Sequence, residues 1–140
     1  NQNTGQAIEE FKRLTKAKNP EYAAEAQYTL AELNFMAGKI DEAEKIIHQI
    51  NANPSREYYL AKAFILWADI FKSKGNTLQA KQTLQSIIDN YEGDEELIET
   101  ARQKLISLTM QQEKTQQEKQ EKRQEQQEAV DEIIIVDEPR

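Results

Sequence analysis

The chain has 140 residues, a formal net charge of −7 and no cysteine, which excludes disulfides, zinc–thiolate sites and thiol nucleophiles. The charge is uneven, because residues 1–93 carry 12 acidic and 11 basic side chains, whereas residues 94–140 carry 13 and 7. This acidic C-terminal third disfavours binding to nucleic acids or anionic membrane surfaces, because proteins bind both partners through clustered Lys and Arg. No apolar stretch approaches the ~20 residues of a membrane span, and no signal peptide is visible.

The first predicted element is a helix within residues 1–17. Its inward side is expected to carry Ala7, Phe11 and Leu14, which recur at helical spacing. This helix has no partner before it in the sequence, although helix pairs follow it. We therefore expect it to be the second helix of an earlier repeat, and the sequence to be part of a longer protein.

A first complete helix pair is predicted to follow. Asn19 stands before Pro20, which places a capping side chain ahead of a proline at the first helical position. That helix is expected to run to about residue 37, where Gly38 ends it, as glycine does at many helix ends. The second helix is expected at about 40–52. Its apolar face consists of Ala43, Ile46, Ile47 and Ile50.

A second helix pair is predicted by the same signals. Asn53 and Pro54 repeat the capping pattern, so the next helix is expected at about 55–74, where Gly75 ends it. Its inward residues are Ala63, Trp67, Ile70 and Phe71. Asn76 with Gln79 resembles a capping box for the helix expected at about 77–91. The inward residues of that helix are Ala80, Leu84, Ile87 and Ile88.

The two pairs are copies of one unit with a period of 37 residues. Alignment of YTLAELNFMAGKIDEAEKII with ILWADIFKSKGNTLQAKQTLQSII matches Leu30 with Trp67, Ala31 with Ala68, Gly38 with Gly75, and Ala43 with Ala80. The alanines allow two antiparallel helices to approach closely where they cross. No strand-like alternation occurs in residues 1–110, so the predicted fold class is all-α, built from antiparallel helix-pair repeats.

This unit resembles the tetratricopeptide repeat, a helix pair marked by a large apolar residue, a small one, a turn glycine and an alanine. The matching positions are Leu30-Ala31, Gly38 and Ala43, and then Trp67-Ala68, Gly75 and Ala80. The period of 37 departs from the usual 34, and Tyr91 and Gly93 stand where the family often has proline. The resemblance covers residues 4 to about 108 and implies a solenoid that binds protein or peptide partners.

Two longer segments resemble repeats of bacterial cell-envelope proteins, including outer-membrane assembly lipoproteins and a periplasmic Tol-Pal-associated coordinator. They are YAAEAQYTLAEL and QAKQTLQSIIDNYEGDEELIETARQKL. This resemblance implies a location in the periplasm or at the outer membrane, and the cytoplasm is the alternative. The leading hypothesis is therefore a protein-binding scaffold of the bacterial envelope. The alternative is a structural assembly element that associates with itself.

The repeat domain is expected to end near residue 108. A helix is predicted to begin near Asp94, and its residues Leu97, Ala101, Leu105 and Leu108 recur at spacings of three and four, as a capping helix requires. Residues 109–129 are predicted to extend this helix without a core face, since 111–128 hold only Gln, Glu, Lys, Arg and one Thr. Two interpretations stay open, a solvated helix that frays and a rigid rod that makes contacts in a larger assembly.

Residues 130–140 are predicted to be a separate apolar tail flanked by acidic residues. The apolar side chains stand in a row: Ile133, Ile134, Ile135 and Val136. Because such β-branched residues favour extended backbone, residues 132–137 are expected to form an extended segment that docks on an apolar surface or strand edge of another molecule. A disordered tail is the alternative. Self-association through this tail and the long helix would produce a homo-oligomer.

The sequence offers no catalytic pattern. There is one histidine, His48, which is expected on a helix as a packing or surface residue. No HExxH pattern, glycine-rich phosphate loop or nucleophile elbow occurs. We therefore expect no enzyme activity, no cofactor and no metal site.

The resemblance implies a partner-binding surface on the inner, concave face, which the first helix of each pair lines in this family. Counting from the turn glycines places Glu25, Tyr28, Glu32, Phe35, Lys62, Ile65, Asp69 and Lys72 on that face. Some family members clamp a peptide carboxylate with Lys and Asn there, but Glu32 and Asp69 stand where the asparagine would be, so this clamp is not expected. Tyr28 and Phe35 are expected to form a platform for a peptide, and partial burial against a neighbouring helix is the alternative.

Overall fold

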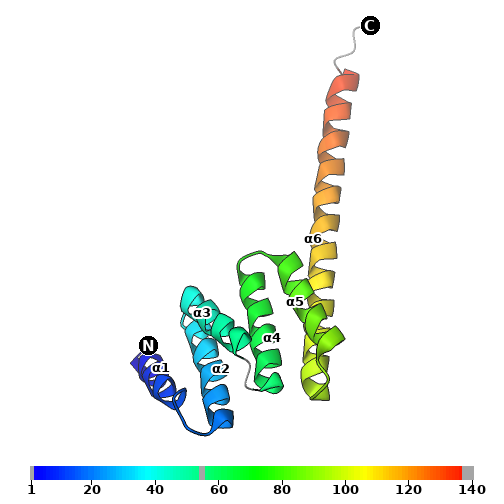
Figure 1. Ribbon diagram of the computed structural model, residues 1–140. Helices are drawn as coiled ribbons and strands as arrows, with labels where there is room; N and C mark the ends of the chain where they lie inside the picture. Colours follow the sequence, from blue (N-terminus) through cyan, green and yellow to red (C-terminus); the bar gives the residue numbers. More distant parts are fainter. Residues whose placement is uncertain (1, 54–55, 137–140) are drawn as a thin grey trace. The chain divides into compact units, whose positions relative to one another are not determined.

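The computed structural model describes residues 2–53 and 56–136, and within these ranges it contains six helices and no strand. The helices are α1 (Gln2–Leu14), α2 (Pro20–Met36), α3 (Ile40–Ala52), α4 (Glu57–Ser73), α5 (Thr77–Asn90) and α6 (Glu95–Val136) (Figure 1). The predicted all-α class of helix-pair repeats with a long C-terminal helix is confirmed. The chain divides into two compact units, Asn1–Leu105 and Ile106–Arg140, which are described separately.

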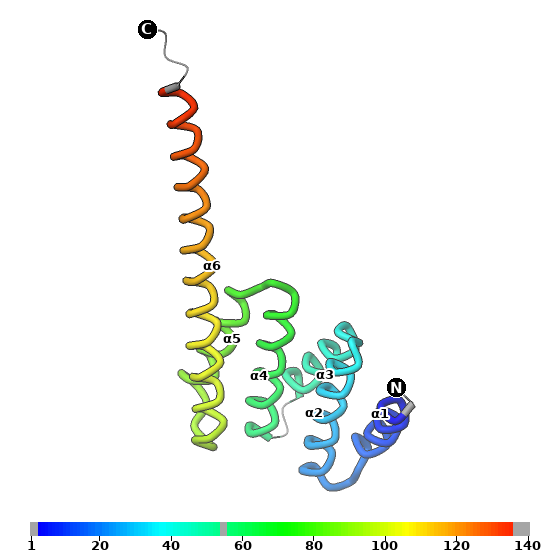
Figure 2. Tube along the Cα trace, turned by 180° about the vertical axis from the view of Figure 1, so that it is seen from behind, coloured from blue at the N-terminus to red at the C-terminus, as the bar shows by residue number. Residues whose placement is uncertain are grey.

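The first unit is built from helix pairs. In both views α2 and α4 lie side by side, while α3 and α5 cover one face of them (Figures 1 and 2). α1 precedes the first pair and packs against α2. The face of α2 and α4 that α3 and α5 leave uncovered is called the inner face below.

Identical turns join the two helices of each pair. Gly38 and Gly75 have φ values of +78° and +77°, a left-handed conformation that favours glycine. The Lys39 amide donates to the Asn34 carbonyl at 2.8 Å, and the Asn76 amide donates to the Phe71 carbonyl at the same distance. These six-residue hydrogen bonds are Schellman motifs, which satisfy carbonyls at a helix end. The period of 37 therefore repeats the backbone geometry as well as the residue types.

The predicted helix starts are only partly correct. The Asn19 side chain accepts a hydrogen bond from the Glu21 amide at 2.9 Å, with Pro20 in the first helical position, so this cap is confirmed. The cap predicted at Asn53 is wrong, because Asn53 follows the last residue of α3, whereas α4 begins at Glu57. Pro54 lies outside the described residues.

The capping box predicted at Asn76 is also wrong. Asn76 precedes α5, but its side chain makes no capping hydrogen bond. A capping box requires the Gln79 side chain to accept a hydrogen bond from the Asn76 amide. That amide already donates to the Phe71 carbonyl in the turn, so the turn and the capping box compete for one N–H group.

Small and branched apolar residues fill the core of the first unit. The alanines at the helix crossings are all buried, with 0–1% of their surface exposed: Ala31, Ala43, Ala68 and Ala80. Ile46, Ile47 and Ile50 of α3 are buried as predicted, and so are Ala63 and Ile70 of α4. Leu84 and Ile87 are buried in α5, whereas Ile88 is half-buried.

Two helices pack in a register that differs from the prediction. In α1, Ile8 is buried and Phe11 packs against the core, but Leu14 is 43% exposed because it is the last residue of the helix. At the start of α6, Ile98 and Ala101 are buried, whereas Leu97 is half-buried. Ala101 and Leu108 are buried as predicted, so the difference in α6 is confined to the start of the stripe, where Ile98 is more deeply buried than Leu97.

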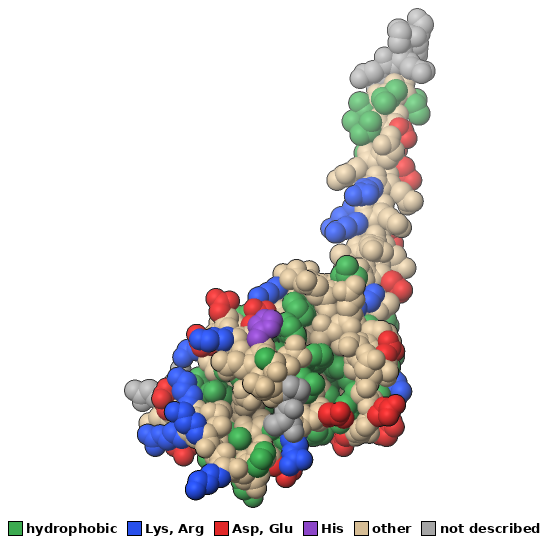
Figure 3. Space-filling model, in the orientation of Figure 1, with side chains coloured by type: hydrophobic (Ala, Val, Ile, Leu, Met, Phe, Trp, Pro, Cys, Tyr) green, Lys and Arg blue, Asp and Glu red, His purple; other side chains and the backbone are tan. Residues whose placement is uncertain are grey.

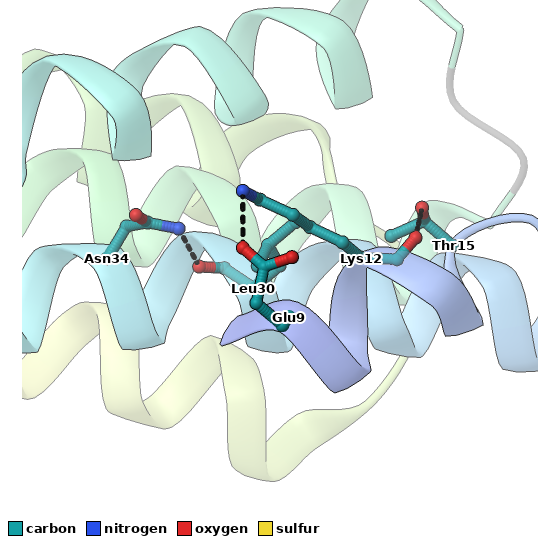
Figure 4. A network of polar contacts seen from close by, with 5 residues as sticks. All are labelled: Glu9, Lys12, Thr15, Leu30 and Asn34. Carbon is teal, nitrogen blue, oxygen red and sulfur yellow. Dashed lines mark hydrogen bonds and ion pairs between the residues drawn. The ribbon is translucent and has the colours of Figure 1, made fainter. Parts of the chain in front are cut away.

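Asn34 is the buried polar side chain of the first unit among the described residues. The Asn34 side-chain amide donates to the Leu30 backbone carbonyl one turn earlier at 2.8 Å (Figure 4). The Asn34 backbone carbonyl accepts the hydrogen bond from the Lys39 amide that closes the first turn. The nearby Lys12 and Glu9 of α1 form an exposed ion pair at 3.0 Å. The side-chain N–H and the backbone carbonyl of Asn34 therefore both have hydrogen-bond partners although the residue is buried.

The lone histidine is a packing residue, as predicted. The His48 ring meets the Trp67 ring edge-on, with centroids 4.8 Å apart, and Trp67 also stacks on Phe71 at 5.4 Å. Trp67 and Phe71 are half-buried and contribute apolar area to the contact between α3 and α4. His48 itself is exposed, which agrees with its expected place as a packing or surface residue.

The second unit is helical over its described residues. The Gln-, Glu- and Lys-rich stretch belongs to α6, which confirms the predicted helical extension. The predicted extended segment is wrong for residues 132–136, which continue the helix, while Asp137 lies outside the described residues. The preference of β-branched residues for strands depends on neighbouring strands, and here the preceding good helix formers extend their hydrogen-bond ladder instead.

Candidate partner-binding face

A cluster of one lysine and three tyrosines forms the centre of the inner face. The Nζ atom of Lys62 lies over the Tyr28 ring at 4.6 Å from its centroid, and it lies 5.5 Å from the Tyr58 centroid and 6.0 Å from the Tyr59 centroid. Tyr28 comes from α2, whereas the other three residues come from α4. A lysine over an aromatic face contributes about 0.5–1 kcal/mol at an exposed site, so the cluster ties the two helices together.

The two adjacent tyrosines of α4 give this cluster an aromatic edge. The rings of Tyr58 and Tyr59 meet edge-to-face with centroids 5.1 Å apart. Tyr58 keeps 39% of its surface exposed, although it is a large aromatic residue at a helix start. Exposed, rigid aromatic rings are enriched in binding sites, because burying them on association costs little side-chain entropy.

Carboxylates lie on two sides of the cluster. Burial raises the pKa of the Tyr28 hydroxyl above its usual range, and the Glu32 carboxylate, which accepts a hydrogen bond from this hydroxyl, raises it further. Burial also raises the pKa of Tyr59, with a further contribution from the negative charges of Glu25 and Glu21. The Tyr28 and Tyr59 hydroxyls are therefore neutral at pH 7, and their rings are available for stacking and cation–π contacts.

An ion pair connects α4 to the beginning of α6 within the first unit. Lys104 Nζ donates to both carboxylate oxygens of Asp69, at 3.0 and 3.1 Å. Both side chains keep about a third of their surface exposed, so the pair is worth only ~0–1 kcal/mol. Its effect is to fix where the Asp69 carboxylate lies.

The structure brings together five of the eight predicted residues of this face: Glu25, Tyr28, Glu32, Lys62 and Asp69. The other three do not join the cluster: two are covered, and Lys72 lies one helical turn beyond Asp69 on the same side of α4. Phe35 packs against the hydrophobic core, Ile65 is buried, and Lys72 is exposed near the end of α4. The structure thus favours partial burial for Phe35 over a role in the peptide platform.

The sequence prediction missed Tyr58, Tyr59 and Lys104. A signal for Tyr58 was present, because it lies one helical turn before Lys62 and 37 residues after Glu21, which also borders the cluster. Counting one turn further back from Gly75 would have included it. Lys104 had no such signal, since its contact with Asp69 depends on how α6 packs.

The predicted contact residues of the tail are exposed. Ile133, Ile134 and Ile135 each keep more than half of their surface in contact with solvent, and Val136 ends the described helix. Hydrophobic side chains gather near this end of α6 after a long polar and charged stretch (Figure 3). Because α6 is helical here, Val130, Ile133 and Ile134 share one side of it, while Ile135 lies among acidic residues.

Over residues 2–53 and 56–136, no group of three or more His, Asp or Glu side chains could hold a metal ion. Over the same ranges, no helix combines the length and the apolar character that crossing a membrane requires. Glu32 and Asp69, which stand where a carboxylate clamp would have asparagine, both lie close enough to Tyr28 for their charges to act on its hydroxyl.

Comparison with known proteins supports the repeat assignment. The family model described as tetratricopeptide repeat matches residues 1–65, which contain α1, the first helix pair and half of α4. The match covers less than half of the chain, and it agrees with the helix-pair architecture of the described residues, which is that of tetratricopeptide-like repeats. Repeats of this kind generally mediate protein–protein interaction. Neither the curated proteins nor the solved structures that were searched gave a match to the chain.

Proposed function

We propose that this chain is a non-catalytic scaffold that binds a peptide or a segment of a partner protein on its inner face. The partly exposed tyrosine cluster around Lys62 is the observation that carries this proposal. It provides aromatic surface, an ammonium group and carboxylates within one side-chain length of each other. Such a mixture of a rigid aromatic centre and a polar rim is typical of protein-binding surfaces.

Replacement of Tyr28 and Tyr58 together with Ala should reduce partner binding far more than it reduces stability. Tyr28 packs partly against the core and Tyr58 is 39% exposed, so the exposed parts of the two rings are the area that a partner would cover. We expect partner recovery in a cross-linking pull-down from a cell extract of the source organism to fall about tenfold or more, as for a binding hot spot. Chemical denaturation of the same variant gives the stability change.

The matched control for this experiment is Tyr22→Ala. Tyr22 is also in α2, is 63% exposed and makes no ring contact among the described residues. Its replacement should leave partner recovery unchanged. Equal recovery by the double variant and this control would remove the inner face from the proposal.

Self-association is a second candidate function, favoured by the apolar stripe near the end of α6. Val130, Ile133 and Ile134 are exposed on one side of a helix that is otherwise polar from residue 111 onward. Burying one such side chain in a contact is worth about 1.5–3 kcal/mol, which makes three exposed ones on one side a candidate interface.

Removal of residues 130–140 should lower the association state of the protein or abolish a partner contact. The measurement is molar mass by light scattering over a range of concentrations, together with partner recovery. Replacement of Gln126 and Gln127 by Ala is a control that changes the same helix without removing the stripe. If the truncated and intact proteins have the same mass and the same partners, the stripe has no role in association.

We further propose a location in the bacterial envelope, in the periplasm or at the outer membrane. The proposal is supported by the resemblance of residues 22–33 and 79–105 to repeats of envelope proteins. Fractionation of the source cells, with detection by an antibody against the repeat unit, tests it. Recovery in the cytoplasmic fraction alone would contradict it.

A further inference from the structure

We infer that the partner segment received by the inner face is basic, and that one of its lysine or arginine side chains is seated on the tyrosine rings beside Glu25. The inference rests on the proposed function of this face and specifies the chemistry of the partner. It follows from the charges around the rings and from the position of Lys62.

The groups around the rings carry an excess of negative charge. Glu32 and Asp69 lie near Tyr28, and Glu25 and Glu21 lie near Tyr59. Two ammonium groups oppose these four carboxylates, that of Lys62 over the rings and that of Lys104 on Asp69. Two negative charges therefore remain uncompensated beside the rings, and this charge attracts a cation and repels a carboxylate.

The carboxylates next to Tyr59 are available to a partner. Glu21 and Glu25 are both exposed, and neither forms an ion pair within residues 2–53 and 56–136. Asp69, in contrast, is already bound by Lys104. An incoming cation would thus meet unpaired acids at the α2 side of the cluster, next to the exposed ring of Tyr58.

Lys62 shows that the rings hold an ammonium group. Its Nζ atom lies within 6.0 Å of three tyrosine centroids, which is within the range of a cation–π contact. Lys62 is therefore an internal occupant of a site suited to cations. A cation from a partner must either displace it from the rings or lie next to it, and in both cases the charge of Lys62 opposes binding.

The test uses three short peptides of glycine and alanine that differ at two positions, which hold arginine, glutamine or glutamate. Each is labelled with a fluorophore, and its binding to the full chain is followed by anisotropy at low ionic strength. We expect the arginine peptide to bind about tenfold more tightly than the glutamate peptide, as for charge-steered recognition, with salt weakening the difference. Tighter binding of the glutamate peptide would overturn the inference.

Lys62→Met supplies the sharper test, because the expected change is a gain. Methionine keeps the length of the side chain but removes the competing charge, so affinity for the arginine peptide should rise about fivefold. Lys72→Met in the same helix is the matched control, since Lys72 is exposed and has no ring contact among the described residues. A loss of affinity in Lys62→Met, or an equal change in both variants, would overturn the inference.

Replacement of Glu21 and Glu25 with Gln should weaken binding of the arginine peptide and leave the glutamine peptide unaffected. Retention of full arginine affinity in this variant would also overturn the inference. A different result would contradict the proposed function, namely unchanged partner recovery by the variant in which Tyr28 and Tyr58 are both replaced with Ala. Glutamate preference together with lost partner recovery would mean that the inner face binds a partner of the opposite charge.

Discussion

Leu84→Ala should lower the free energy of unfolding by about 2–5 kcal/mol, which is the largest effect expected of a single substitution in this protein. Leu84 lies in α5 with 0% of its surface exposed. Truncation removes its buried methyl groups from the core and leaves a cavity that neighbouring helices fill only in part. Urea denaturation followed by circular dichroism at 222 nm measures the change.

Leu78→Ala is the matched control, since it is the same substitution in the same helix. Leu78 is 67% exposed, so its replacement should change the free energy of unfolding by less than about 0.5 kcal/mol. The difference between the two variants isolates burial from helix propensity, because Leu and Ala are both good helix formers. Equal stabilities would show that α5 does not pack through Leu84.

Ala43→Leu should destabilise the first unit by about 1–3 kcal/mol through overpacking. Ala43 lies in α3 with no exposed surface, in the core cluster that also contains Ala31 of α2. The larger side chain must separate α2 from α3 or adopt a strained rotamer. A lower midpoint of thermal unfolding, measured by circular dichroism, is the expected result.

Ala52→Leu is the control for this experiment, because Ala52 is exposed at the end of the same helix. It should leave the midpoint unchanged within error. The equivalent substitution Ala80→Leu, 37 residues after Ala43, should repeat the loss in the second pair. If Ala43→Leu and Ala52→Leu had the same midpoint, the alanine would not mark a close helix crossing.

The repeat architecture was predictable because its signals are local. The turn glycines adopt the left-handed conformation that ends a helix, and the alanines at the crossings have no room for a larger side chain. These requirements fall on single positions and recur at a period of 37, so one sequence read against itself shows them. The bounds of α2 to α5 followed to within about two residues.

The acidic residues and Tyr28 of the inner face were predictable for the same reason, since a turn glycine sets the register of the helix that precedes it. Tertiary packing decided the rest. Whether Lys62 of α4 lies on Tyr28 of α2, and whether Lys104 reaches Asp69, depends on the distance between helices that are far apart in sequence. No local pattern fixes that distance.

The errors at the Asn76 cap and in the tail have a common cause, which is competition for the same backbone groups. The Asn76 amide is used by the turn and is unavailable to a capping box, and the amides of residues 132–136 continue the ladder of α6 instead of pairing as a strand. The sequence by itself determined which residues are apolar, which are charged and where the repeats begin and end. Only the folded chain decided which partner each backbone and side-chain group takes, because each N–H group can satisfy one of several acceptors and packing selects among them.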